Sequence, residues 1–193
     1  MIAQTRRRLA GDKPDSATRV VSLPDPDSRP IVKGRLGKPV EFGFKAQVVD
    51  NEDGIVLDHT IEEGNPADAP QLAPAIRRIT KRTGKAPRAV TADRGYGQAK
   101  VDADLFEIGV ETVAIPRKGQ PGRARQEHER KPAFRRLIKW RTGSEGRISY
   151  LKHRYGWARS GMDGRDRTAI WCGHGVLAHN LVKITRLAAA EAA

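Results

Sequence analysis

The chain has 193 residues, 31% of them charged, with a single cysteine and a formal net charge of +13. This length suits one domain with a buried core, and no stretch approaches the roughly 18 apolar residues that span a bilayer. The N-terminus lacks the apolar centre of a secretory signal, and one cysteine excludes an internal disulfide framework. We therefore expect a cytoplasmic protein without a membrane segment.

The positive charge is concentrated in one segment. Residues 114–167 hold 16 lysines and arginines against 5 acidic residues, whereas the rest of the chain holds 20 against 18. Such a segment is typical of a surface that binds a polyanion, and nucleic acid is the polyanion we expect. The alternative is a solvated basic face with no partner. Membrane binding is disfavoured, because the segment does not alternate as an amphipathic helix throughout.

The first third of the chain predicts a lead-in followed by a hairpin. Residues 1–38 are rich in Pro, Asp, Arg and Gly, which predicts an irregular segment. Residues 40–50 and 55–61 have strand composition, and the NEDG turn between them predicts an antiparallel pair.

Helices and strands alternate in the next part. Leu72, Ile76 and Ile79 recur at helical spacing between a candidate N-cap, Asp68, and a stop at Gly84. The later predicted elements are a strand (88–93), a short helix (97–109), a strand (111–116), a basic loop (117–131) and closing helical segments (145–155 and 173–193). This order predicts a mixed α/β sheet flanked by helices.

Two carboxylates stand out as candidate site residues. Asp93 follows the predicted strand in the stretch AVTADRGYG. There it either caps the next turn or projects from the end of the sheet, where catalytic and metal-binding groups often lie. Glu145 is predicted to open a helix, with Arg141 and Lys152 on the same face. Its alternative role is a first-turn glutamate favoured by the helix dipole, with both basic residues as solvent-facing partners.

Four stretches resemble one family, the DDE transposases of bacterial insertion sequences. TADRGYG resembles the family's Asp-x-Gly-Tyr motif, and the order Arg141, Glu145, Lys152 is similar to the signature around its catalytic glutamate, with Ile138 where that signature has tyrosine. KPVEFGFKAQVV and HGVLAHNLVKI also resemble the family, so the similarity extends from about residue 25 to residue 187.

The resemblance implies a ribonuclease H-like mixed sheet in a catalytic domain over residues 39–187. A basic insertion lies around residues 117–141, and an Ala-rich tail follows at 188–193. The implied protein is a transposase that cleaves and joins insertion-sequence DNA. Its implied partners are the double-stranded DNA of transposon ends and target, with a homodimer in the full-length form and a nucleoid-associated location in the cytoplasm.

The implied chemistry uses two Mg²⁺ or Mn²⁺ ions, for which carboxylate oxygens are suitable ligands. By resemblance, Asp93 is catalytic and shared between both metals, and Glu145 is catalytic and a ligand of one. Arg141 and Lys152 would hold DNA phosphates near the cut, although Lys152 is equally compatible with a non-specific surface role.

The basic loop and two tryptophans are further candidates for DNA contact. Trp140 and Trp157 flank Glu145, and each is a candidate to stack on an unpaired base; core packing is the alternative for one of them. The loop residues expected to follow the DNA backbone without reading its sequence are Arg117, Lys118, Arg123 and Arg125.

The chain departs from the family upstream of FGFKAQVV, where the family's first catalytic Asp lies on a first strand. The stretch here is short and Pro-rich, and Asp25 and Asp27 are the acids in a suggestive setting. We therefore expect the C-terminal part of a longer transposase, without the first strand and first Asp, marginally stable and nearly or fully inactive. The competing interpretation is a non-catalytic basic DNA- or RNA-binding module, and a Mg²⁺-dependent nuclease on the same fold is a third.

Overall fold

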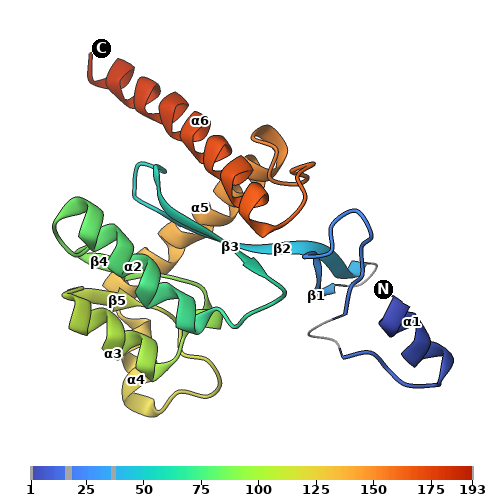
Figure 1. The fold of residues 1–193 in the computed structure, drawn as a ribbon. Helices are drawn as coiled ribbons and strands as arrows, with labels where there is room; N and C mark the ends of the chain where they lie inside the picture. The colour runs from blue at the N-terminus through green and yellow to red at the C-terminus, as the bar shows by residue number, and fades with distance from the viewer. Residues whose placement is uncertain (1, 16–18, 36–37, 193) are drawn as a thin grey trace.

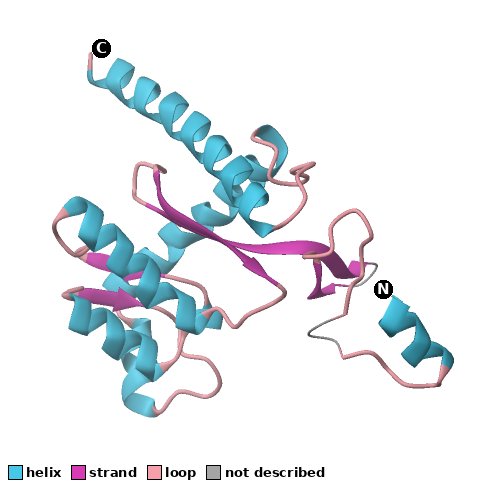
Figure 2. Cartoon of the chain, viewed as in Figure 1, coloured by secondary structure: helices cyan, strands magenta, loops and turns pink. Residues whose placement is uncertain are grey.

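The structure, a computed structural model, describes residues 2–15, 19–35 and 38–192, and the side chains of these residues except 33–35, 38, 39, 144 and 145. Figures 1 and 2 show its helices and strands. In chain order they are α1 (Ile2–Leu9), β1 (Arg29–Arg35), β2 (Lys38–Asp50), β3 (Val56–Glu63), α2 (Ala69–Thr83), β4 (Ala89–Thr91), the 3-10 helix η1 (Arg94–Tyr96), α3 (Ala99–Ile108), β5 (Thr112–Ala114), α4 (Arg123–Arg130), α5 (Pro132–Arg154) and α6 (Arg165–Glu191).

The strands form two separate sheets, so the mixed α/β class is confirmed, whereas the single mixed sheet that the sequence predicted is divided in two among the described residues. The first sheet has the order β1-β2-β3 and is antiparallel; the second pairs β4 with β5 in parallel. The long strand β2 pairs with β1 near residues 40–43 and with β3 along residues 44–50. The predicted hairpin of β2 and β3 is therefore confirmed.

Four predicted segments differ from the structure. Residues 1–38 were expected to be irregular, but they contain α1 and β1. The basic loop contains α4, and α6 begins at Arg165, eight residues before the predicted segment. The helix predicted to open at Glu145 begins at Pro132 instead, because proline suits a first helical position. Gly143 and Gly146 do not break it, since the buried Phe134 and Leu151 anchor the helix at its two ends.

Two hydrophobic clusters hold these elements together. The larger lies between α2, α3, β4 and β5 and includes Leu72, Ile76 and Ile79, so the predicted inner face of α2 is confirmed. The smaller joins β3, α5 and α6 through Val56, Leu151 and Val176, with Trp157 packed against it. The second cluster therefore brings the C-terminal half of the chain onto the β2–β3 hairpin.

Two polar side chains of α6 complete this attachment. The Asn180 amide accepts a hydrogen bond from Val56 N at 2.9 Å and donates one to Val56 O at 2.9 Å, much as a neighbouring strand would. The buried His179 donates from Nε2 to Gly54 O at 2.9 Å. The HGVLAHNLVKI stretch thus attaches α6 to β3.

No helix in the described ranges combines the length and apolar character needed to cross a membrane.

Candidate active site after strand β4

Asp93 lies at the turn that follows β4. Its backbone is extended, and its Oδ1 accepts a hydrogen bond from Gly95 N at 2.7 Å, which caps η1. Asp93 therefore does cap the turn, as one of its two predicted roles requires, and it uses one carboxylate oxygen to do so. The side chain is exposed, so capping does not bury the charge.

A second carboxylate converges on the same turn. Asp68 stands at the N-cap position of α2, yet its carboxylate forms an ion pair with Lys45 Nζ at 2.6 Å instead of capping the helix. A methyl group on Gly95 would lie 2.9 Å from both Asp68 Oδ2 and Asp93 Oδ1, so the two oxygens are less than about 6 Å apart. Asp68 was predicted only as a cap, and no local pattern in the sequence pairs it with Asp93.

Tyr96 connects this turn to the first sheet. Its hydroxyl accepts a hydrogen bond from Gln47 Nε2 of β2 at 3.2 Å. Burial, with smaller contributions from Asp68 and Asp93, raises the pKa of Tyr96 to about 12. The hydroxyl therefore stays protonated at neutral pH and adds no charge beside the two carboxylates.

The turn also touches the start of the basic segment. Gly97 leaves so little space that a Cβ there would lie 1.9 Å from Pro116 O, and Lys118 N donates to Gly97 O at 2.8 Å. Arg94 donates to the carbonyl oxygens of Arg117 and Gly119, each at 3.0 Å. The turn that follows Asp93 thus contacts the backbone of Arg117 and Lys118.

The arginines of the basic segment differ in burial and in their ion-pair partners. Arg117 and Arg125 form ion pairs with the buried Asp102 carboxylate at 2.8 and 3.0 Å, and both side chains are about 20% exposed. These pairs hold the segment to α3. Lys118 is exposed, and Arg123 is almost fully exposed beside its helical neighbour Glu127.

Helix α5 carries the second group of sequence candidates. It contacts both β4 and β5, with Arg141 half-buried and Lys152 exposed. Glu145 belongs to α5, but its side chain lies outside the described residues. How near its carboxylate lies to Asp93 is therefore a prediction.

Arg147, which sequence reasoning did not select, fixes the position of α5. It forms an ion pair with Asp50 at the end of β2, and its guanidinium lies 5.4 Å from the centre of the Trp140 ring. Burial lowers the pKa of Arg147. Trp157 donates from Nε1 to Cys172 O at 3.0 Å, so it has the packing role expected of one tryptophan.

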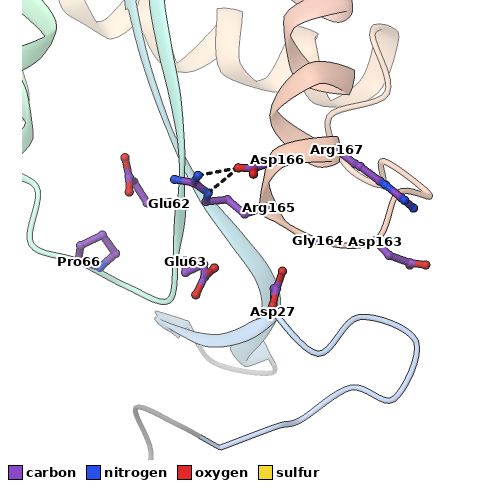
Figure 3. Close-up of a pocket in the computed structure, with 9 residues that line it drawn as sticks. All are labelled: Asp27, Glu62, Glu63, Pro66, Asp163, Gly164, Arg165, Asp166 and Arg167. Carbon is purple, nitrogen blue, oxygen red and sulfur yellow. Dashed lines mark hydrogen bonds and ion pairs between the residues drawn. The ribbon is translucent and has the colours of Figure 1, made fainter.

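Asp25 and Asp27 lie at the N-terminus of α6. Asp25 Oδ1 accepts a hydrogen bond from Gly164 N at 3.1 Å, where a carboxylate is favoured by the helix dipole. Asp27 lines an open cavity of about 600 Å³, shown in Figure 3. The other lining residues are Glu62, Glu63, Pro66, Asp163, Gly164, Arg165, Asp166 and Arg167.

Among the side chains that the structure describes, no three His, Cys, Asp or Glu residues are grouped closely enough to hold a metal ion. Asp68 and Asp93 nevertheless supply two hard oxygen ligands close together, the donor type that Mg²⁺ and Mn²⁺ take. This pair fits part of a divalent-ion site.

The structure is thus a mixed α/β protein in which the carboxylate after a parallel strand lies close to a second carboxylate at the N-cap of α2, with a basic segment against the same turn. The family model of the transposase DDE domain matches residues 21–181, most of the chain, and the chain belongs to that family. The match includes Asp93, Arg141, Glu145 and Lys152. No curated protein and no solved structure matches the chain.

Proposed function

We propose that this chain is the catalytic part of a DNA transposase that cleaves and joins the DNA of an insertion sequence. The observation that carries the proposal is the convergence of Asp68 and Asp93 at Gly95, in a chain of the transposase DDE family. Members of this family typically use divalent metal ions. Carboxylates paired in this way suit such an ion.

Within this chain, the proposed site has Asp93, Asp68 and Glu145 as oxygen donors for two Mg²⁺ or Mn²⁺ ions. When bound, these ions would relieve negative charge on the phosphate and lower the pKa of an attacking water or hydroxyl. Lys45 holds one oxygen of Asp68, which leaves Oδ2 directed toward the turn. The protonated Tyr96 keeps the β4 turn attached to β2 through Gln47.

Basic residues of the segment that touches this turn, together with those of α5, supply the proposed DNA contact. Lys118 and Lys152 are exposed and suit phosphate binding, which positions DNA without reading its sequence. Arg141 on α5 is proposed to act beside them. Arg117 and Arg125 contribute mainly by holding the segment through Asp102.

A ribonuclease H-like arrangement is supported by the open edges of the two sheets. In the part of the chain that the structure describes, β2 has no strand opposite β3 along residues 44–50, and β4 pairs with β5 alone. One added strand between β2 and β4 would join both sheets, and we propose that this strand carries the first catalytic Asp. The catalytic unit is assigned to residues 39–187, with little activity expected from the present chain alone.

Metal binding tests the proposal without requiring turnover. Mn²⁺ titrated into the purified chain by calorimetry should bind, and Asp93→Asn or Glu145→Gln should weaken binding at least about tenfold. Glu107→Gln, an exposed acid on α3, is the matched control and should leave binding unchanged. Equal Mn²⁺ affinity in Asp93→Asn and the parent chain would overturn the proposed site.

DNA binding separates this function from the non-catalytic module. Fluorescence anisotropy with a duplex should show affinity that falls steeply with salt, and Lys118→Glu with Lys152→Glu should reduce the salt slope by about two. Asp93→Asn and Glu145→Gln should retain this binding. Salt-sensitive DNA binding with no Mn²⁺ binding would favour the module.

A further inference from the structure

Lys45 of β2 lies beside one of the two paired carboxylates. Its Nζ is 2.6 Å from Asp68 Oδ1 and donates to Pro66 O, also at 2.6 Å, so it ties the loop before α2 to the first sheet. Both charged side chains are partly shielded, with 25% of Lys45 and 35% of Asp68 exposed. Water and salt therefore screen this ion pair less than a pair on the open surface.

The ion pair prevails over a competing role of the Asp68 carboxylate. Asp68 stands at the N-cap position of α2, where a carboxylate ordinarily accepts a backbone hydrogen bond and is favoured by the helix dipole. Its side chain forms no such bond here. The carboxylate is instead directed to the ammonium group of Lys45, which shows how strongly this cation attracts it.

Lys45 offsets part of the negative charge at the turn. Asp68 Oδ2 and Asp93 Oδ1 both approach the position of a Gly95 side chain, so the two carboxylates repel each other. The bonded partner of Asp93 is the neutral N–H of Gly95 at 2.7 Å, and Arg94 donates to two backbone carbonyl oxygens. Lys45 thus sets one positive charge against the two negative charges of the pair.

We propose that Lys45 is a built-in counter-ion that keeps the affinity of this carboxylate pair for divalent ions low. The inference rests on the ion site proposed above and adds a regulating residue to it. A divalent ion at Asp68 shares that carboxylate with the ammonium group, so the two cations repel each other. At close to the dielectric constant of water, removing a unit charge within about 6–9 Å of a doubly charged ion raises its affinity about five- to tenfold.

The sign of the change separates this role from a purely structural one. If Lys45 only held Asp68 in place, its loss would release the carboxylate and weaken ion binding, as loss of a supporting contact usually does. A counter-ion has the opposite effect, because its removal leaves both carboxylates and deepens the negative potential between them.

Calorimetric titration of Mn²⁺ into the Lys45→Met chain tests the proposal. This variant should bind Mn²⁺ about five- to tenfold more tightly than the parent chain, and should bind measurably even where the parent does not. Lys81→Met is the matched control and should match the parent, because it removes the same charge from the last turn of α2, at the end of the helix opposite Asp68.

The outcomes distinguish this inference from the proposed function. An affinity of Lys45→Met equal to or below that of Lys81→Met would overturn the counter-ion role, even where the parent chain binds Mn²⁺ through Asp93. An affinity of Asp93→Asn equal to that of the parent chain would instead overturn the ion site itself.

A second ion and a second variant cover the case in which methionine disturbs folding. Lys45→Gln removes the charge but keeps a side chain that can donate a hydrogen bond. Its gain in affinity should be larger for Tb³⁺, followed by luminescence, than for Mn²⁺, because the repulsion grows with the charge of the ion. Added salt should reduce both gains. A disturbed fold would lower both affinities, and a gain no larger for Tb³⁺ than for Mn²⁺ would overturn the proposal.

Discussion

Replacing Asn180 by alanine should weaken the fold substantially. Two hydrogen bonds to Val56 are lost, each with a net contribution of about 1 kcal/mol. Val56 is 5% exposed, so water reaches its N–H and C=O poorly after the change, and this adds a penalty of about 1–3 kcal/mol. We expect the free energy of unfolding to fall by about 3–5 kcal/mol, a large part of the roughly 5–15 kcal/mol that stabilises a typical domain.

Urea unfolding, followed by circular dichroism and by tryptophan fluorescence, measures this loss. The midpoint should fall by about 1–2 M, with little change in slope. Thr185→Ala is the matched control, because the Thr185 hydroxyl bonds to Leu181 O of its own helix and not to another element among the described residues, and its effect should stay within about 0.5 kcal/mol. An Asn180→Ala midpoint equal to that of the control would refute the attachment of α6 through Val56.

Three further predictions concern other positions. Gly97→Ala should unfold or severely destabilise the protein, because its methyl group would meet Pro116 O at 1.9 Å. The control Gly122→Ala, whose methyl group would point into open space, should leave the melting temperature nearly unchanged. Equal melting temperatures for the two variants would contradict this prediction. Because the pKa of Tyr96 is raised to about 12 in the folded chain, its contribution to the free energy of unfolding should be fully present below about pH 10 and should be lost as the pH rises through about 12. Urea unfolding at alkaline pH should show this loss in the parent chain but not in Tyr96→Phe. Asp58→Ala should cost about 1–3 kcal/mol in unfolding free energy, less than loss of a fully buried pair, because its two arginine partners on α2 are half-exposed and regain water. A change below about 0.5 kcal/mol would show that this ion pair contributes little.

Elements with strong local signals could be predicted from the sequence. The inner face of α2 follows from the spacing of Leu72, Ile76 and Ile79, and the helix ends at Gly84, whose φ of 77° suits glycine. The β2–β3 pair follows from strand composition on both sides of a turn. These signals act between residues close in sequence, so the sequence alone suffices to interpret them.

The start of α5 could not be predicted, because competing local signals point to a different residue. The stretch TGSEG has a glycine and a serine directly before Glu145 and a second glycine after it, a composition typical of a helix start. Tertiary packing of Phe134 and Leu151 outweighs that preference, and the helix continues from Pro132 through Glu145.

By itself, the sequence determined the family resemblance, the concentration of basic charge in residues 114–167, and Asp93 as a carboxylate at a strand end. Only the tertiary structure decided which groups meet it. Asp68 reaches Asp93 because the N-cap of α2 lies at the β4 turn, and Asn180 reaches Val56 across 124 residues. Such contacts depend on the path of the whole chain, since no local propensity acts over that separation.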